Sequence, residues 1–353
     1  MDSRKFQLFQ IEPTTRCNLN CVMCPWKDIH VSGCDMKLDL FRNISKYFSQ
    51  VSEIDLTGSG EPLMNPDLNE MVGISRESGC RVGFSTNGML LVPTLAKELI
   101  SAGLDWVAVS IDAAREKTYA SIRVGGDLGL VLHNLEYLKS QRQRRNKRSP
   151  KLMIFFVMMK QNYHELQKLI EIASRLEVDV VVAKHLDVIS SSVHDKKRIF
   201  DCSELGMTGE DLDKVLEDAK SRAYSSGIKL RIYQVTDYEN AICEQNPLKT
   251  LFVSVHGEVS PCISLAYMRQ RYFKGIRIKT PLIRFGNVKH SDIMSIFDSK
   301  EYVGFRRTFE QRSARSIFSA INSLLKNFNN VQLSKVIPTA PQGCRHCYNL
   351  YEM

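Results

Sequence analysis

The sequence predicts an α/β protein in which a parallel sheet curls into a partial barrel of six β/α units, followed by a small C-terminal domain. Residues 6–185 alternate six short β-rich runs with helical patterns. The β-rich runs are almost continuously apolar, as in strands that helices cover on their faces. A closed barrel of eight units typically takes about 250 residues. The alternation stops by residue 185, so a six-unit, open barrel is expected.

The barrel elements follow in chain order. Strands are predicted at residues 6–11, 53–57, 81–85, 105–111, 152–159 and 178–183. Helices are predicted at 38–48, 68–75, 93–101, 128–141 and 163–176, where apolar residues recur at helical spacing. Right-handed crossovers place these helices outside the sheet. Reactive residues are then expected in the loops at the carboxyl ends of the strands.

The remaining elements belong to a transition and a second domain. A helix is predicted at 208–226 and a strand at 229–233, after which cysteines return. Residues 251–260 are typical of a β-hairpin around a His-Gly turn. Residues 313–336 carry an apolar stripe at helical spacing, which indicates a core-packing helix. We therefore divide the chain into domains at 1–235 and 236–353.

Composition limits the class of protein. The 353 residues are 43% hydrophobic, yet no apolar run approaches the roughly 20 residues of a membrane span. The first residues lack the apolar region of a signal peptide, so a cytoplasmic protein without membrane association is expected. Ten cysteines then favour metal ligands over disulfides. Part of the net charge of +9 lies in two basic stretches at 141–148 and 269–279. Such stretches favour an anionic substrate or an acidic partner protein over nucleic acid.

The cysteines at 17, 21 and 24 form a C-x3-C-x2-C cluster directly after the first strand. A [4Fe–4S] cluster takes four ligands, so three thiolates leave one iron free for a group that is not protein. A structural zinc site usually has four protein ligands, and only Cys34 lies near. A zinc loop and three unrelated thiols remain the alternative interpretations.

This cluster resembles the signature of the radical S-adenosylmethionine (radical SAM) enzymes, C-x3-C-x-Φ-C, with Met23 in the apolar position. The resemblance implies that the free iron chelates SAM and that one electron cleaves SAM to methionine and a 5′-deoxyadenosyl radical. That radical abstracts a hydrogen atom from the substrate. The architecture of the family is also a partial barrel of six β/α units.

Two further motifs at strand ends are similar to those of the family. Gly58, Gly60 and Glu61 lie in a Gly-Ser-Gly-Glu-Pro stretch that resembles its GGE motif, with Ser59 in place of a glycine. The resemblance implies that this backbone receives the SAM amino group and that Glu61 favours the ammonium charge. Asn87 follows the third strand in a Ser-Thr-Asn-Gly stretch, where it either forms a left-handed turn or contacts SAM or substrate.

The fourth strand ends in Ser110 and Asp112, which lie on one face because side chains alternate along a strand. By resemblance, both would hydrogen-bond the ribose or the substrate. Arg123 occupies a position where relatives often place an arginine near the SAM carboxylate, which a guanidinium binds bidentately. A surface salt bridge is the alternative for Arg123. The sequence identifies no residue that acts directly on the substrate.

A second group of cysteines lies near the C-terminus at Cys243, Cys262, Cys344 and Cys347. Their spacing around Gly257 resembles the twitch domain, a shortened relative of the SPASM domain, and implies an auxiliary [4Fe–4S] cluster with four thiolate ligands. Zinc is the alternative metal. The stretch from Arg312 to Gln342 is longer than the usual linker and would shape specificity or bind a partner.

The resemblance implies a radical SAM enzyme with two [4Fe–4S] clusters, SAM, and a low-potential electron donor such as flavodoxin or ferredoxin. Its expected substrate is a peptide, a protein or a cofactor precursor. Dehydrogenation of a small polar metabolite such as a sugar or aminocyclitol is the second interpretation. The third interpretation is a metal-binding module without catalytic activity, which the motifs at the strand ends disfavour.

Overall fold

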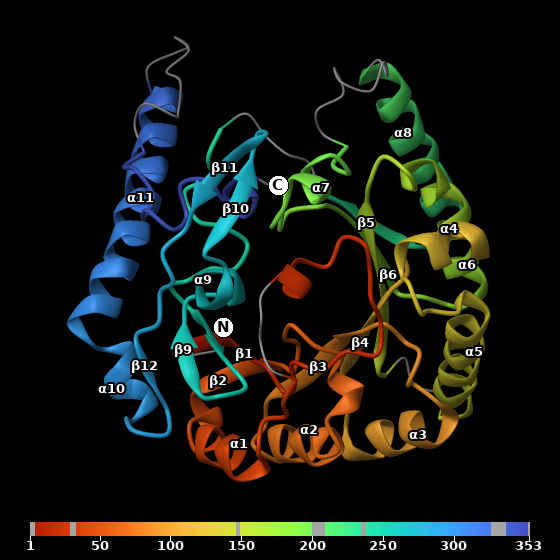
Figure 1. Ribbon diagram of the computed structural model, residues 1–353, viewed down its shortest axis with the longest axis horizontal. Coiled ribbons are helices and arrows are strands. Elements are labelled where there is room, and N and C mark those ends of the chain that lie inside the picture. Colours follow the sequence, from red (N-terminus) through yellow and green to blue (C-terminus); the bar gives the residue numbers. More distant parts are fainter. Residues whose placement is uncertain are drawn as a thin grey trace.

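A partial barrel forms the body of the protein, as the computed structural model shows (Figure 1). The structure describes residues 4–28, 33–145, 149–199, 209–233, 238–325 and 337–351. Its strands are β1 (Phe6–Ile11), β2 (Val51–Asp55), β3 (Arg81–Thr86), β4 (Trp106–Ser110), β5 (Lys151–Met158), β6 (Val180–His185) and β7 (Lys229–Ile232). These strands pair in chain order and all in parallel. The predicted six-unit barrel is confirmed, and β7 extends it by one strand.

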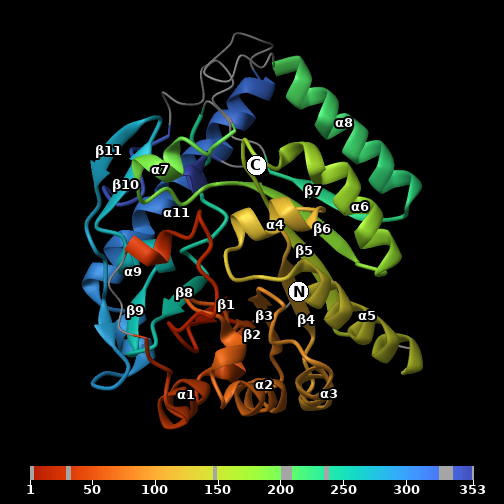
Figure 2. The same ribbon diagram turned by 45° about the vertical axis from the view of Figure 1, so that its right-hand side comes forward.

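The helices of the barrel follow its strands, and most of them cover the outside of the sheet (Figure 2). They are α1 (Leu38–Ser45), α2 (Leu68–Glu77), α3 (Pro93–Ala102), α4 (Glu116–Ile122), α5 (Leu128–Arg144), α6 (Leu166–Arg175), α7 (Ser192–Asp195) and α8 (Gly209–Ser225). In α6, for example, Leu166, Leu169, Ile170 and Ala173 are buried while the opposite side carries charges. Such a stripe directs one side of the helix onto the sheet. The sequence missed α4, a two-turn helix with only two buried residues.

The second domain continues the same sheet rather than starting a new one. Strand β8 (Thr250–Val253) pairs in parallel with β1, and β9 (Glu258–Ser260) and β12 (Gly286–Asn287) follow it antiparallel. The predicted hairpin at 251–260 is confirmed by β8 and β9. The domain boundary near 235 stays a prediction, because the sheet crosses it.

The rest of this region consists of α9 (Ile263–Tyr267), the hairpin of β10 (Gln270–Phe273) and β11 (Ile276–Lys279), α10 (Ile293–Phe297) and α11 (Lys300–Leu325). The basic stretch at 269–279 is thus a β-hairpin and not a loop. Helix α11 contains the first part of the predicted helix at 313–336; residues 326–336, like Cys202, lie outside the described residues. No helix in the described ranges is long and apolar enough to cross a bilayer.

Candidate iron–sulfur and SAM site

The loop that follows β1 carries the first three cysteines across the middle of the barrel (Figure 1). Two backbone hydrogen bonds hold it against the end of α4: Asn20 N donates to Val124 O at 2.8 Å, and Val22 N donates to Ile122 O at 2.9 Å. Cys17 is exposed, and Cys21 and Cys24 are partly exposed. The three thiols lie close enough to influence one another's ionisation. Parallel strands end at this side, where a barrel gathers its reactive groups.

The thiols are chemically suited to a cationic metal centre. Partial desolvation raises the pKa of Cys17. Burial and, to a smaller extent, the neighbouring thiols raise the pKa of Cys21 to about 11 against the opposing effect of Arg123. Protons therefore occupy these sites at neutral pH until a metal displaces them, because thiolates are the ligands. Within the described ranges, no three His, Cys, Asp or Glu side chains converge closely enough for one bare metal ion.

Met23, in the cysteine loop, points away from solvent. It is buried in a small apolar cluster that joins the barrel to the second domain; the other members are Ile122, Met159, Leu186, Ile189, Phe273 and Tyr348. Cys21 and Val22 pack against the same cluster. The apolar position before Cys24 therefore anchors the loop, and a role of Met23 toward SAM remains a prediction.

The glycines of the loop after β2 permit close backbone contact. A side chain at Gly60 would lie 2.4 Å from the carbonyl oxygen of Arg16, and one at Gly58 would lie 2.3 Å from Glu12. The next residue, Glu61, donates its amide to Arg16 O at 2.7 Å. Only glycine fits at these two positions. The loop predicted to receive SAM is therefore fixed directly against the cysteine loop.

Glu61 is buried, and its carboxylate is satisfied by the protein. Oε1 accepts from Thr86 Oγ1 at 2.6 Å and from Leu63 N at 3.2 Å, and Oε2 accepts from Asn87 N at 2.7 Å. Burial raises the pKa of Glu61, whereas these hydrogen bonds oppose the rise. Glu61 thus ties the end of β3 to the end of β2; its predicted effect on the SAM ammonium is not tested by these contacts.

Asn87 joins the third strand end to the cysteine loop. Its amide nitrogen donates to Asn18 Oδ1 at 2.8 Å, and its own Oδ1 accepts from Met89 N at 2.9 Å. The residue after it, Gly88, has the positive φ of 80° expected of the turn. In the structure, Asn87 therefore stabilises the turn after β3 and contacts the cysteine loop.

Asp112 and Arg123 form a buried ion pair next to Cys21. Asp112 Oδ2 accepts from Arg123 Nε at 2.7 Å and from its terminal nitrogen at 2.6 Å, while Oδ1 accepts from Val157 N at 2.8 Å. The other terminal nitrogen of Arg123 lies 3.9 Å from Cys21 Sγ. Burial alone would lower the pKa of Arg123, but Asp112 and Cys21 raise it overall. The salt bridge of the alternative interpretation is present, but it is buried rather than at the surface. Ser110, two residues before Asp112, is partly exposed.

Replacing Asp112 by Asn is expected to destabilise the protein by about 3–5 kcal/mol, because it leaves the Arg123 guanidinium buried without a counter-charge. The exposed pair of Arg42 and Glu70 provides the matched control, since Glu70→Gln should cost at most about 1 kcal/mol. The measurement is thermal unfolding of both variants by circular dichroism. Equal unfolding temperatures for Asp112→Asn and Glu70→Gln would contradict the proposed importance of this pair.

Sequence reasoning missed Glu12, a fully buried carboxylate at the end of β1. Oε1 accepts from Ser59 N at 2.9 Å and from Ser59 Oγ at 2.7 Å. Oε2 accepts from Val255 N at 3.0 Å and from the hydroxyl of Tyr267. One carboxylate therefore connects the glycine loop to the hairpin and helix of the second domain. The available signal was an acidic residue in an apolar strand just before the cysteines.

The variant Glu12→Gln is expected to lose about 3 kcal/mol of stability. Each oxygen of the Glu12 carboxylate accepts from two donors, and the NH2 group that replaces one oxygen would leave its two donors without an acceptor. SAM affinity should also fall, since the glycine loop loses its anchor. Ser59→Ala, which removes one donor and keeps the carboxylate, is the matched control and should cost about 1 kcal/mol. Thermal unfolding and equilibrium SAM binding measure both effects; a Glu12→Gln variant as stable as Ser59→Ala would contradict them.

The four C-terminal cysteines lie in one region of the second domain. Cys243 and Cys344 share a cluster with Phe309, Ala340 and Leu350, and Cys262 precedes α9. Cys347 N donates to Cys344 O at 3.1 Å, which folds the C-x2-C segment into a turn. Burial and nearby Cys347 together raise the pKa of Cys262 to about 11. Burial and the neighbouring cysteines likewise raise the pKa of Cys243 and Cys344.

The start of the 312–342 stretch supports this region. Arg312 is fully buried and donates to Ala241 O at 3.1 Å, to Asn240 O at 2.9 Å and to Glu239 Oε2 at 2.9 Å. It also donates to Pro338 O. Arg312 thus joins α11 to the two segments that carry Cys243 and the C-x2-C pair. His346, between these last cysteines, is exposed and packs edge-on against Phe273.

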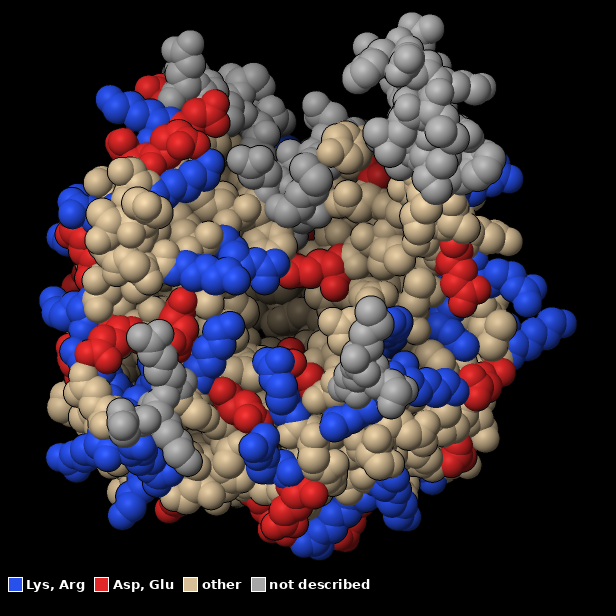
Figure 3. Space-filling model, turned by 180° about the vertical axis from the view of Figure 1, so that it is seen from behind, with Lys and Arg blue, Asp and Glu red and all other residues tan. Residues whose placement is uncertain are grey.

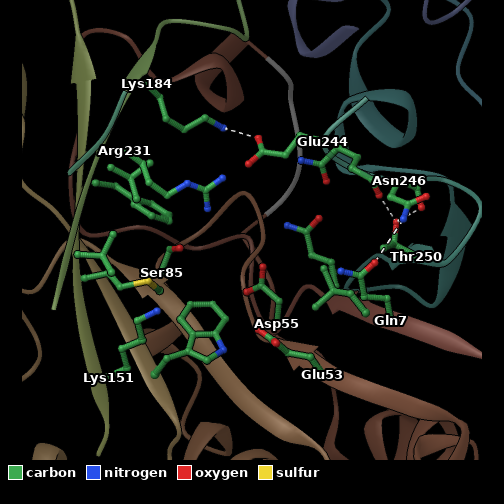
Figure 4. Close-up of a pocket in the computed structure, with 18 of the residues that line it drawn as sticks. Gln7, Glu53, Asp55, Ser85, Lys151, Lys184, Arg231, Glu244, Asn246 and Thr250 are labelled. Atoms are coloured by element: carbon green, nitrogen blue, oxygen red, sulfur yellow. Dashed lines mark hydrogen bonds and ion pairs between the residues drawn. The ribbon is translucent and has the colours of Figure 1, made fainter. Parts of the chain in front are cut away.

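A cavity of about 440 Å³ occupies the barrel interior beneath these loops (Figure 4). Three of its lining residues, Arg81, Lys151 and Lys229, are exposed at the first positions of their strands. The cavity therefore opens where the strands begin, on the face that Figure 3 shows hollowed at its centre. At the other end it reaches Ser85, on the strand that leads to Asn87, and Glu244, the residue after Cys243.

Asp55 faces this cavity from β2, and burial raises its pKa from 3.8 to about 7. Because the folded-state pKa lies above the unfolded value, the folded protein binds more protons between these values, and stability falls as pH rises from about 4 to about 7. The loss is at most about 4 kcal/mol. Comparing thermal unfolding of wild type and Asp55→Asn across this range tests it: the wild type should lose more stability, and parallel curves would contradict the shift.

Comparison with known proteins agrees with this arrangement. The family model of the radical SAM superfamily matches residues 11–173, and that of the SPASM iron–sulfur cluster-binding domain matches residues 243–348. The tungsten-containing aldehyde ferredoxin oxidoreductase cofactor-modifying protein of Pyrococcus furiosus is 28% identical over 305 residues, which cover 84% of this chain and 82% of that relative. The AdoMet-dependent heme synthase of Methanosarcina barkeri is 30% identical over 173 residues, 48% of each chain. Among solved structures, Streptococcus suis SuiB bound to S-adenosylmethionine superimposes with a TM-score of 0.64 and 16% identity, over 86% of this chain and 68% of SuiB, which supports the fold.

Proposed function

Because this chain belongs to the radical SAM superfamily and carries a SPASM-type iron–sulfur domain, we propose that it abstracts hydrogen from a small molecule during the maturation of a cofactor. The observation that carries this proposal is the similarity to the cofactor-modifying protein of Pyrococcus furiosus. That similarity extends through 82% of the relative and 84% of this chain, and so includes both domains. The other relative described above is similar over half of the chain only.

The residues of the first site fit a SAM-binding [4Fe–4S] cluster. Cys17, Cys21 and Cys24 would hold it, and three thiolates leave one iron for SAM. When bound, the cluster supplies the electron that cleaves SAM to methionine and a 5′-deoxyadenosyl radical. Gly58 and Gly60 let the backbone approach the ligand, since no side chain fits there.

The charged residues around this loop position it. Asp112 fixes the Arg123 guanidinium beside Cys21, where its positive charge favours the thiolate form. Glu61 and Asn87 hold the second and third strand ends together. We therefore assign Asp112 and Glu61 to orientation of the site. Ser110, which is partly exposed, is a proposed contact for SAM or substrate, and Arg123 and Asn87 would serve as contacts in addition to those they make within the protein.

Cys243, Cys262, Cys344 and Cys347 would ligate one auxiliary [4Fe–4S] cluster, because four thiolates complete its ligand set. Held by these four cysteines, such a cluster would supply a site for electron transfer to or from the substrate or the first cluster. A flavodoxin or ferredoxin of low potential is the proposed external donor, and the basic surface of the protein would suit its acidic surface.

The substrate class can be tested without knowing the substrate. Anaerobically reconstituted protein with SAM and reductant is mixed with a lysate of its native cells, separated by a size filter into small-molecule and protein fractions. We expect the small-molecule fraction to accelerate 5′-deoxyadenosine formation several-fold. Acceleration by the protein fraction alone would reject cofactor maturation in favour of peptide or protein modification.

A further inference from the structure

The wall of the barrel cavity includes residues that lead along the chain to both cysteine sites. Its wall includes Asp55 and Ser85, and Thr57 links these two, because the Thr57 hydroxyl donates to Asp55 and accepts from Ser85 N at 2.9 Å. Thr57 directly precedes Gly58. On the other side, Glu244 directly follows Cys243. A molecule in the cavity would therefore be flanked by the SAM loop and by the auxiliary site.

Apart from Arg81 and Glu244, which pair with Glu53 and Lys184, the charged residues of this cavity are divided between two walls (Figure 4). Lys151, Lys184 and Arg231 project from β5, β6 and β7, whereas Glu53 and Asp55 project from β2. A ligand that spans the cavity would thus meet cations at one end and carboxylates at the other. Charge complementarity of this kind determines which ligands are accepted.

Two of these charges, Lys184 and Glu53, already have partners. Lys184 Nζ lies 3.1 Å from Glu244 and 3.5 Å from Asp187, and Glu53 pairs with Arg81 at 3.3 Å. Ion pairs within the protein therefore account for Lys184 and Glu53, so these two residues are not the first candidates for ligand contacts.

Arg231 and Asp55 differ from them. Arg231 donates to the Tyr233 hydroxyl at 2.8 Å, and no carboxylate of the described residues lies within 4.0 Å of its guanidinium nitrogens. Asp55 accepts one hydrogen bond, from Thr57, through Oδ1, and the pKa of its carboxyl is raised by burial. Both groups gain most from a ligand of opposite charge, because a charge-assisted hydrogen bond is about twice as strong as a neutral one.

We propose that this cavity is the substrate pocket and takes a small molecule with an anionic group, carboxylate or phosphate, on Arg231 and an amine on Asp55. This inference rests on the proposed function. The volume of about 440 Å³ suits a small ligand, as such pockets typically measure about 300–1,000 Å³. A folded protein does not fit in it.

The test uses anaerobic holoenzyme and titration calorimetry with four probes: D-glucosamine 6-phosphate, D-glucosamine, D-glucose 6-phosphate and D-glucuronate. The wild type should bind D-glucosamine 6-phosphate about tenfold or more tightly than D-glucosamine, since one charge-assisted contact distinguishes them. The wild type should also bind D-glucosamine 6-phosphate more tightly than D-glucose 6-phosphate, because only the first carries an amine. The affinities of D-glucose 6-phosphate and D-glucuronate show whether phosphate or carboxylate is the preferred anion.

Variants assign these preferences to residues. Arg231→Gln should abolish the preference for the phosphorylated probe, and Asp55→Asn should abolish the preference for the amine. Arg222→Gln on α8, whose side chain pairs with Glu171 outside the barrel, is the matched control and should keep both. Absence of the preferences in the wild type, or their survival in both variants, overturns the pocket assignment.

The same wild-type preparation is assayed for reductive SAM cleavage without probe. Cleavage without the binding preferences rejects the pocket alone, whereas failure to cleave SAM rejects the proposed function.

Discussion

Replacement of Cys17, Cys21 and Cys24 together by Ala is expected to remove about half of the iron and all measurable SAM cleavage. Two [4Fe–4S] clusters hold about eight irons, and only one of them has these three ligands. The variant should keep about four irons per chain in the second domain, which is tied to the barrel through Glu12 and Met23 rather than through these thiols. Iron determination and 5′-deoxyadenosine analysis after anaerobic reconstitution measure both results.

Cys34→Ala is the matched control for this experiment. Cys34 lies beside the same loop, with its Sγ 3.7 Å from Thr15 Oγ1 and 3.8 Å from His256 Nε2, and it is not among the proposed ligands. It should keep about eight irons and wild-type cleavage. A triple variant with its full iron, or a Cys34→Ala variant that loses half, would require a different ligand set.

Replacement of Cys344 and Cys347 by Ala is expected to separate the two clusters. It removes half of the auxiliary ligands and none of the first site, so about four irons and reductive SAM cleavage should remain. Conversion of the substrate should fail. Some stability should be lost, because Cys344 packs against the apolar cluster of Phe309 and cluster ligation contributes to folding. Iron content, circular dichroism and 5′-deoxyadenosine production measure the three effects.

His346→Ala serves as the control for the double variant, because His346 lies between the two cysteines and is exposed. It should retain both clusters and substrate conversion. A folded double variant with about four irons that cannot cleave SAM would show instead that Cys344 and Cys347 serve the first site.

The elements that sequence predicted best are those whose pattern is local. The strand at 152–159 is almost wholly apolar and appears as β5, and the apolar stripe of 163–176 appears as α6. The hairpin at 251–260 was predicted from its turn. Each of these depends on residues a few positions apart, so a single sequence contains the signal.

The contacts that sequence could not predict join distant segments. Glu12 meets Tyr267, which is 255 residues away, and Arg312 meets Glu239 across 73 residues. Asp112 and Arg123 were both identified, but only the fold shows that they pair with each other. Likewise, the polar lumen residues Asp55 and Arg231 lie on β-rich runs whose alternation did not distinguish a cavity from solvent.

The central claim is that this chain cleaves SAM reductively at a cluster held by Cys17, Cys21 and Cys24. The most direct measurement is product analysis after incubation of the anaerobically reconstituted protein with SAM and a strong low-potential reductant. The account predicts 5′-deoxyadenosine and methionine in equal amounts, formed slowly even without substrate and absent with Cys24→Ala. Formation of S-adenosylhomocysteine as the only product would contradict it, because that product indicates methyl transfer without radical chemistry.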